Sequence, residues 1–121
     1  MKNTQALKLN KDFKRLYYRG KSIVRGTVVV YALPNRRPFN RLGLTCGKSI
    51  GKAVKRNRVK RLMRESYRLL EHNVKKGYDI VLVARTRAAD VKCTHVLKDL
   101  TFSFGKLGMF IEDEKNSDFG S

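Results

Sequence analysis

Residues 51–65 read Gly51-Lys52-Ala53-Val54-Lys55-Arg56-Asn57-Arg58-Val59-Lys60-Arg61-Leu62-Met63-Arg64-Glu65, and they open the longest helical pattern of the chain. Apolar and small residues recur from there in steps of three and four, which predicts a helix over residues 52–73. The buried stripe of this helix is expected to consist of Val59, Leu62, Met63, Ser66 and Leu70. A helix with one buried stripe needs a neighbouring layer, and the segments on either side predict it.

The flanking segments predict a sheet and two further helices. Residues 10–18 predict a short helix, capped by Asn10 and stopped by Gly20. A β-branched run over residues 22–33, broken or bulged at Gly26, and a second run over residues 41–46 predict strands that pair as a hairpin. Residues 78–84 have the continuous apolar character of a central strand, and residues 91–109 predict the third helix. The predicted order is α-β-β-(β)-α-β-α, an α/β sandwich with a sheet of about four strands and helices packed mainly on one face.

The length of 121 residues leaves room for one core, so we expect a single domain over residues 1–111. Residues 112–121 form an acidic tail that we expect to be disordered. No apolar run approaches the ~20 residues of a membrane span, and the first residues lack the apolar core of a signal peptide. Cys46 and Cys93 favour reduced thiols over a disulfide. These features predict a cytoplasmic protein.

The charge is confined to one part of the sequence. Residues 1–68 hold 20 Lys or Arg against only Asp12 and Glu65, whereas residues 69–121 hold 8 basic and 8 acidic residues. The first part therefore carries the whole net charge of +18. Such a one-sided field implies a polyanionic partner, with nucleic acid as the first candidate. An anionic membrane is the second, but it would require large exposed apolar groups opposite the charges.

The central helix gathers these charges along one side. At about 100° per residue, that side carries Arg56, Lys60, Arg64 and Arg68, with Arg58 and Arg61 next to it. Like charges at this spacing cost an isolated helix a few tenths of a kcal/mol per pair, which favours bound phosphates over a merely solvated face. Asn57 is open to two interpretations: its amide reads a base or ribose hydroxyl, or it bonds the helix backbone.

Three aromatic side chains form a second group of candidates. Phe13 and Tyr17 share one face of the first predicted helix, and Tyr31 lies in the first β region. Aromatic rings on an open sheet stack unpaired bases, each worth ~1–3 kcal/mol, although their spacing alone also fits ordinary core packing. The neighbouring cations favour RNA; they are Lys14, Arg15, Arg19 and Lys21.

The sequence argues against an independent catalytic centre. The spacing from Gly43 to the triplet Gly47-Lys48-Ser49 is one residue short of a P-loop. His72 and His95 have no carboxylate partner nearby in sequence, and two acids among residues 1–68 are too few for a two-metal centre. Phosphodiester chemistry would need a reactive centre supplied by another molecule.

Residues 51–65 resemble the signature of the bacterial ribonuclease P protein component. The flanking pieces agree with that family: Asp12-Phe13 followed by Tyr17 and Gly20, then Arg41-Leu42-Gly43-Leu44, then residues 78–85. The resemblance covers residues 8–108. Two departures are small. Ser49 follows Lys48 where the family often has a second lysine, and Cys46 replaces a β-branched residue.

The resemblance implies a subunit of an endoribonuclease whose catalytic RNA, with its Mg²⁺ ions, removes the 5′ leader of precursor tRNA. It also implies an unusual left-handed β-α-β crossover, against the general right-handed rule. The expected partners are the catalytic RNA and precursor tRNA, with no membrane and no obligate protein partner. A structural RNA-binding protein, such as a ribosomal one, and a self-contained nuclease are the rival hypotheses.

By resemblance, no residue of this chain is catalytic, and whether the chain itself ligates a metal stays open. The residues expected to contact the catalytic RNA and help organise its metals are Lys52, Arg56, Asn57, Arg58, Lys60, Arg61, Arg64 and Arg68. The residues expected to line a cleft for the single-stranded leader are Phe13, Tyr17 and Tyr31.

Overall fold

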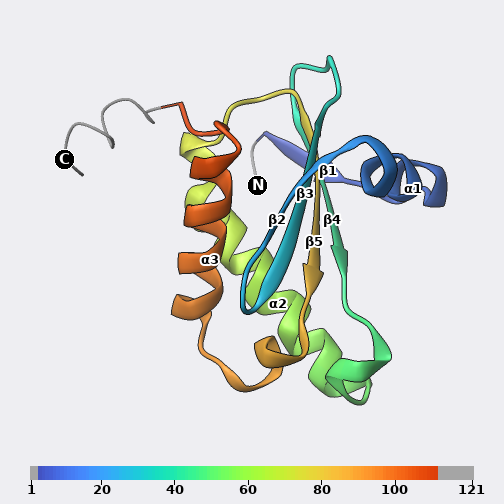
Figure 1. Cartoon of the computed structure of the whole chain (residues 1–121), viewed down its shortest axis with the longest axis vertical. Helices are drawn as coiled ribbons and strands as arrows, with labels where there is room; N and C mark the ends of the chain where they lie inside the picture. The colour runs from blue at the N-terminus through green and yellow to red at the C-terminus, as the bar shows by residue number, and fades with distance from the viewer. Residues whose placement is uncertain (1–2, 112–121) are drawn as a thin grey trace.

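The computed structural model describes residues 3–111, which form five strands and three helices (Figure 1). The strands are β1 (Thr4–Ala6), β2 (Lys21–Val24), β3 (Val28–Pro34), β4 (Asn40–Thr45) and β5 (Tyr78–Ala84). The helices are α1 (Asn10–Arg19), α2 (Ala53–Leu70) and α3 (Cys93–Lys106), joined in places by the short 3₁₀ segments η1 (Lys48–Ile50), η2 (Glu71–Asn73) and η3 (Thr86–Asp90). The predicted acidic tail, residues 112–121, lies outside the described residues.

The strands form one mixed sheet in the order β1-β4-β5-β3-β2. β5 runs parallel to β4 and antiparallel to β3, so it lies between the two. The predicted hairpin between the first β region and residues 41–46 is therefore wrong. Ile80, Val81 and Leu82 are all fully buried, and a strand that is apolar on both faces gains most from the central place.

The predicted strand count of about four is corrected to five. The break at Gly26 is confirmed, since β2 and β3 pair as a hairpin on either side of it. The prediction missed β1 because its three residues, Thr-Gln-Ala, are too few to show an alternation of apolar and polar side chains. β1 pairs in parallel with β4 at the edge of the sheet.

Helices cover both faces of the sheet, which corrects the expectation that they pack mainly on one (Figure 1). α2 and α3 pack on one face, over Ile80 and Leu82 of β5. α1 packs on the other, where Leu16 meets Val81. Because side chains alternate along a strand, the apolar run of residues 80–83 in β5 serves both layers.

α2 follows the prediction closely, with η2 continuing it to Asn73. Val59, Met63 and Ser66 are buried, whereas Leu62 and Leu70 are only half-buried. Tyr67, which was not predicted, is fully buried.

Tyr67 joins α2 to the edge of the sheet. Its hydroxyl oxygen lies 2.9 Å from Thr4 Oγ1 and accepts a hydrogen bond from Asn40 Nδ2 at 3.3 Å. Burial raises the pKa of Tyr67, so the hydroxyl stays protonated at neutral pH.

The ends of α1 differ from the prediction. Leu9, not Asn10, holds the N-cap position, and it makes no side-chain capping bond. Gly20 does end the helix, with an extended backbone, because a Cβ there would lie 2.5 Å from Leu16 O. Within residues 3–111, no helix is long and apolar enough to cross a membrane.

Candidate RNA-binding interface

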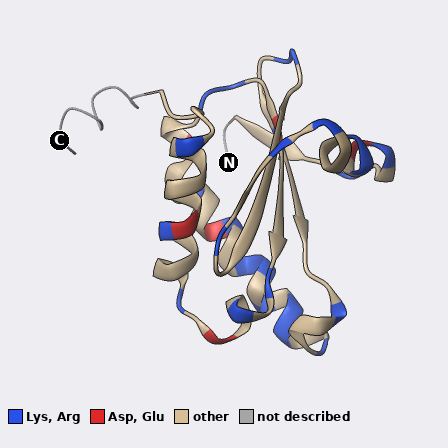
Figure 2. Ribbon diagram, in the orientation of Figure 1, with Lys and Arg blue, Asp and Glu red and all other residues tan. Residues whose placement is uncertain are grey.

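α2 carries its cations on the side turned away from the core, and Figure 2 shows them clustered towards its first turns. Arg56 and Lys60 are half-buried, and the other predicted contact residues are exposed: Lys52, Asn57, Arg58, Arg61, Arg64 and Arg68. Lys60 and Arg64 line a cavity of about 390 Å³ between α2 and the β1–β4 edge. The predicted stripe thus faces both solvent and the edge of the sheet.

Some of these cations are already engaged within the protein. Arg58 Nη1 donates to Ala89 O at 3.1 Å and so ties α2 to η3. Arg68 is paired with Glu65, and its hydrogen bond lowers the pKa of that carboxyl. These two arginines hold the helix surface together, as well as contributing charge to it.

The remaining cations have no anionic partner among residues 3–111; they are Lys52, Arg56, Lys60, Arg61 and Arg64. Arg56 Nε is buried without any acceptor among the described groups. Asn57 makes no side-chain hydrogen bond within the same residues, so the interpretation that it bonds the helix backbone finds no support. This set is unsatisfied in the protein alone and matches the needs of a phosphate-rich ligand.

The three predicted aromatic residues come together on the α1 face of the sheet. The rings of Tyr17 and Tyr31 lie 4.9 Å apart, edge to face. Phe13 packs over Gly43, where a Cβ would lie 2.6 Å from Phe13 Cζ. Phe13 and Tyr31 are partly buried against the core beneath α1, whereas Tyr17 is 42% exposed. The core-packing interpretation therefore fits Phe13, while base stacking by the two tyrosines stays a prediction.

A cleft of about 360 Å³ opens beside these rings, lined by Asn10, Phe13, Lys14, Tyr17 and Thr45. Sequence reasoning missed Thr45, whose Oγ1 lies 3.4 Å from the Tyr17 hydroxyl. The alternation of β4 could have found it, since Thr45 and Gly43 share a face of that strand. We call this hollow the aromatic cleft.

The aromatic cleft lies on the α1 face of the sheet, and the chain leads from it to the basic helix on the other face. Thr45 is followed by Cys46, a free thiol whose pKa is raised by burial despite the opposing charges of Lys60 and Arg56. The chain then passes through η1 into α2. The same end of β4 therefore leads to the aromatic cleft on one face of the sheet and to the unpaired cations of α2 on the other.

A buried ionic network fixes α1 to the other end of β4. Arg41 binds the carboxylate of Asp79 with two nitrogens, at 2.8 and 2.6 Å, and Arg15 adds a third contact at 3.0 Å. Burial opposes the charge of Asp79, but Arg41, Asn35 and Arg15 outweigh it and lower its pKa. The pKa of Arg41 is raised mainly by its hydrogen bond to Asp79.

The possible metal-ligating side chains of residues 3–111 are dispersed over the fold. No group of three His, Cys, Asp or Glu side chains comes together within residues 3–111. His72 and His95 are exposed, in η2 and α3 respectively, and Glu65 is engaged by Arg68. What residues 3–111 do gather at this site is cations and aromatic rings, which suit the binding and orientation of a polyanion.

Comparison with known proteins agrees with this geometry. Residues 1–108 match the family model for Ribonuclease P. The chain belongs to the ribonuclease P protein family. It is 40% identical over 112 residues to the ribonuclease P protein component of Clostridium acetobutylicum, covering 91% of this chain and 94% of that relative. The component of Caldanaerobacter subterraneus subsp. tengcongensis is 47% identical over 93 residues, covering 77% and 79%.

Solved ribonuclease P proteins share the fold. A variant of the Staphylococcus aureus protein superposes with a TM-score of 0.78 and 31% identity, covering 87% of this chain and 89% of that one. The Thermotoga maritima protein gives 0.72 and 32%, covering 80% and 92%. Members of the family work with a catalytic RNA subunit as an endoribonuclease that processes the 5′ leader of tRNA, and this chain is a protein component of that enzyme.

Proposed function

We propose that α2 docks this chain on the catalytic RNA while the aromatic cleft receives the single-stranded leader of precursor tRNA. The observation that carries the proposal is the set of unpaired cations on α2 together with an aromatic hollow at the same end of β4. Phosphate contacts fix position and orientation, and stacked rings accept any base. Together they hold a flexible strand against a folded RNA.

The residues of α2 take different parts in this docking. Lys52, Arg56, Lys60, Arg61 and Arg64 neutralise phosphates, and Asn57 offers its amide to a base edge or ribose hydroxyl. Arg58 and Arg68 add charge but are also held by Ala89 and Glu65. A rigid surface suffers less loss of side-chain freedom on binding than an array of free side chains does.

Tyr17, which lines the cleft, and Tyr31, whose ring lies 4.9 Å from that of Tyr17, stack leader bases, while Phe13 packs between α1 and Gly43 of the sheet. Mg²⁺ is required by the holoenzyme and is held mainly by the RNA, since residues 3–111 lack a suitable donor set. The chain therefore binds and positions, and the hydrolytic centre belongs to the RNA. We also propose that no obligate protein partner is needed and that the folded unit spans residues 1–111. The proposed site of action is the cytoplasm. The left-handedness of the β4–α2–β5 crossover stays a prediction.

The test is leader cleavage by the purified catalytic RNA at low Mg²⁺, with and without the protein. We expect the protein to restore cleavage, and Arg61→Ala to restore it less well than Lys92→Ala, which removes the same charge from the start of α3. Unchanged cleavage on adding the protein would refute the proposal. Cleavage by protein freed of RNA would favour the rival nuclease hypothesis.

A further inference from the structure

A second basic hollow lies on the α1 face of the sheet, across α1 from the aromatic cleft. It has a volume of about 480 Å³, and six cations line it: Lys11, Arg15, Arg19, Arg36, Arg37 and Arg41. The aromatic cleft does not include any of them. We call this hollow the basic pocket.

The cations of the basic pocket outnumber the anions available to them. Asp12 and Asp79 are each engaged by both Arg15 and Arg41. The other four, Lys11, Arg19, Arg36 and Arg37, form no ion pair within residues 3–111. Four uncompensated positive charges around one hollow repel each other unless an anion occupies it.

The loop that brings two of these charges into place is held in a defined shape. Asn35 Nδ2 donates to Asp79 Oδ1 at 2.9 Å and to Phe39 O at 3.2 Å, while Asn35 Oδ1 accepts from the Arg37 N–H at 2.8 Å. Arg36 has a φ of 59°, a left-handed backbone that costs a non-glycine residue on the order of 1 kcal/mol. The loop therefore presents Arg36 and Arg37 from a fixed backbone.

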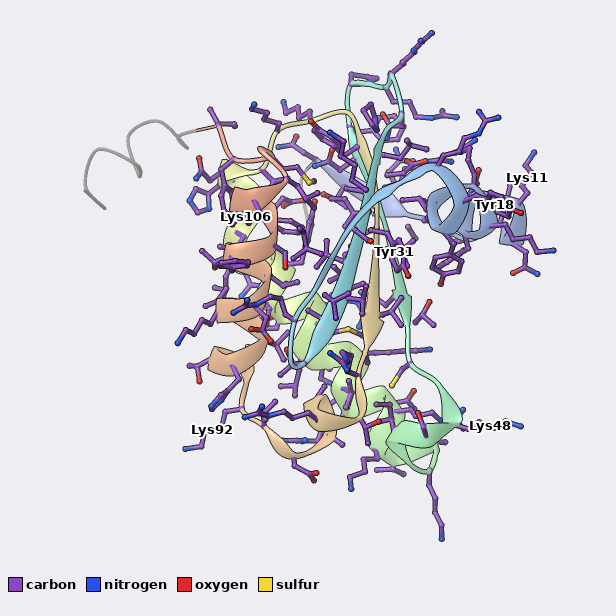
Figure 3. The ribbon with its side chains drawn as sticks, in the orientation of Figure 1. Lys11, Tyr18, Tyr31, Lys48, Lys92 and Lys106 are labelled. Atoms are coloured by element: carbon purple, nitrogen blue, oxygen red, sulfur yellow. The ribbon has the colours of Figure 1, made fainter. Side chains whose placement is uncertain are left out.

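β4 shows how the two hollows are related. Its residues 41, 43 and 45 share one face: Arg41 lines the basic pocket, Gly43 lies beneath Phe13 of α1, and Thr45 lines the aromatic cleft. At ~3.3 Å per residue, about 13 Å of strand separates the two ends. α1 contributes residues to both hollows and lies between them, and Figure 3 shows Lys11 at the end of α1 far from the sheet. Tyr18, also on α1, is 93% exposed.

We propose that the basic pocket binds backbone phosphates of the leader upstream of the bases held in the aromatic cleft. This inference rests on the proposed function, which places the catalytic RNA at α2 and the leader in the aromatic cleft. A strand that enters from the α2 end of β4 and leaves the cleft at α1 passes Lys14 and Tyr18, then reaches the pocket. The pocket contributes charge without base readout, so it raises the affinity for long leaders of any sequence.

The test is a series of precursor tRNAs whose leader is lengthened one nucleotide at a time, with affinity measured for the reconstituted holoenzyme. Wild type should gain affinity in two steps, first when the leader fills the aromatic cleft and again when it reaches the pocket. The variant Arg36→Asn/Arg37→Gln should lose only the second step, by roughly tenfold, the worth of one charge-assisted hydrogen bond. Asparagine is chosen to replace Arg36 because it adopts the left-handed backbone readily, so the shape of the loop should be kept.

The salt dependence gives a second readout. With long leaders the variant should lower the slope of log K against log salt by about 0.7 per lost phosphate contact, whereas short leaders should show no change. The control Lys92→Ala/Lys106→Ala removes two charges on the opposite side of the molecule, along α3, and should leave the second step intact (Figure 3).

Several outcomes would overturn the inference. A second step unaffected by Arg36→Asn/Arg37→Gln would remove the leader from the pocket, as would equal losses for short leaders and mature tRNA. A third outcome is that the RNA-free protein binds inorganic phosphate, that the variant does not, and that the length series shows no second step. This result would assign the pocket to a free anion. Failure of the wild-type protein to promote cleavage of even short-leader precursors would instead refute the proposed function, independently of the pocket.

Discussion

The contact between Gly43 and Phe13 predicts a specific steric coupling beneath the aromatic cleft. In Gly43→Ala the new Cβ would lie 2.6 Å from Phe13 Cζ and 2.8 Å from Cε1, closer than carbon atoms approach. Phe13 must turn or α1 must rise, and overpacking of this kind costs about 1–3 kcal/mol of unfolding free energy. Since α1 also carries Tyr17, affinity for leader-bearing precursor should fall too.

Two further variants isolate the cause. Phe13→Leu lacks both clashing atoms, so the double variant Gly43→Ala/Phe13→Leu should be more stable than the two single losses predict, by ~0.5–3 kcal/mol. Gly105→Ala is the matched control. Gly105 lies in α3 with nothing within 4 Å of its Cβ position, so alanine should be neutral or stabilising by up to ~1 kcal/mol.

The assay is urea unfolding followed by far-ultraviolet circular dichroism, with constant m taken as the sign that only stability has changed. Leader affinity is measured on the same samples. A Gly43→Ala variant as stable as Gly105→Ala would refute the steric argument, and strictly additive losses in the double variant would show that Phe13 is not the partner.

Three more predictions concern the rest of the interface. In filter-binding assays, Tyr31→Ala should weaken the binding of leader-bearing precursor more than the binding of mature tRNA. Equal losses would mean that Tyr31 serves only in core packing. Arg61→Ala should lower the salt slope of catalytic-RNA binding by about 0.7–0.9. Arg58→Ala should also lower the unfolding free energy by about 1 kcal/mol, because it loses the hydrogen bond from Arg58 to a backbone carbonyl. Identical behaviour of the two variants would contradict their separate roles. The lowered pKa of Asp79 adds stability that is complete above its ordinary pKa of 3.8 and is lost as pH falls through the folded-state value. Urea titrations should therefore show that the stability of Asp79→Asn depends less on acid in that window than the stability of wild type does. Equal sensitivity of the two proteins would assign the acid response to other groups.

Periodicity was sufficient for the elements that carry one strong pattern. The stripe of α2 was predicted because Val59, Met63 and Ser66 recur at helical spacing, and the cation stripe followed from the same count. The apolar run of β5 also gave its central place. These features depend on residues close together in the chain.

Features that depend on distant residues were not predictable in this way. The pairing of β3 with β5 instead of β4 is decided by burial of β5 on both faces, which a local turn between residues 34 and 40 cannot reveal. β1 is stabilised by Tyr67 from more than sixty residues away. The basic pocket joins α1, the loop before β4 and the start of β4, and in sequence its cations looked like scattered surface charge.

The internal engagement of Arg58 and Arg68 was likewise invisible in the pattern. Both arginines belong to the signature stretch or its continuation, and their spacing marks them as equals of Arg61 and Arg64. Only the packing of η3 against α2 shows that Arg58 already has an acceptor. Charge counts therefore overstate the number of phosphates this helix can meet at once.

During synthesis the central strand β5 emerges after the whole of the excess charge. Residues 1–68 carry the net +18, while β3 and β4 each pair with β5 and not with each other, so the sheet cannot close before β5 is made. At translation rates of ~5–20 residues per second, Ala84 follows Arg68 by roughly one to three seconds. The nascent chain is then a polycation without a closed sheet, able to hold RNA by charge but without a formed cleft. We therefore expect discrimination among RNAs to depend on residues 69–121, although none of the excess charge lies there.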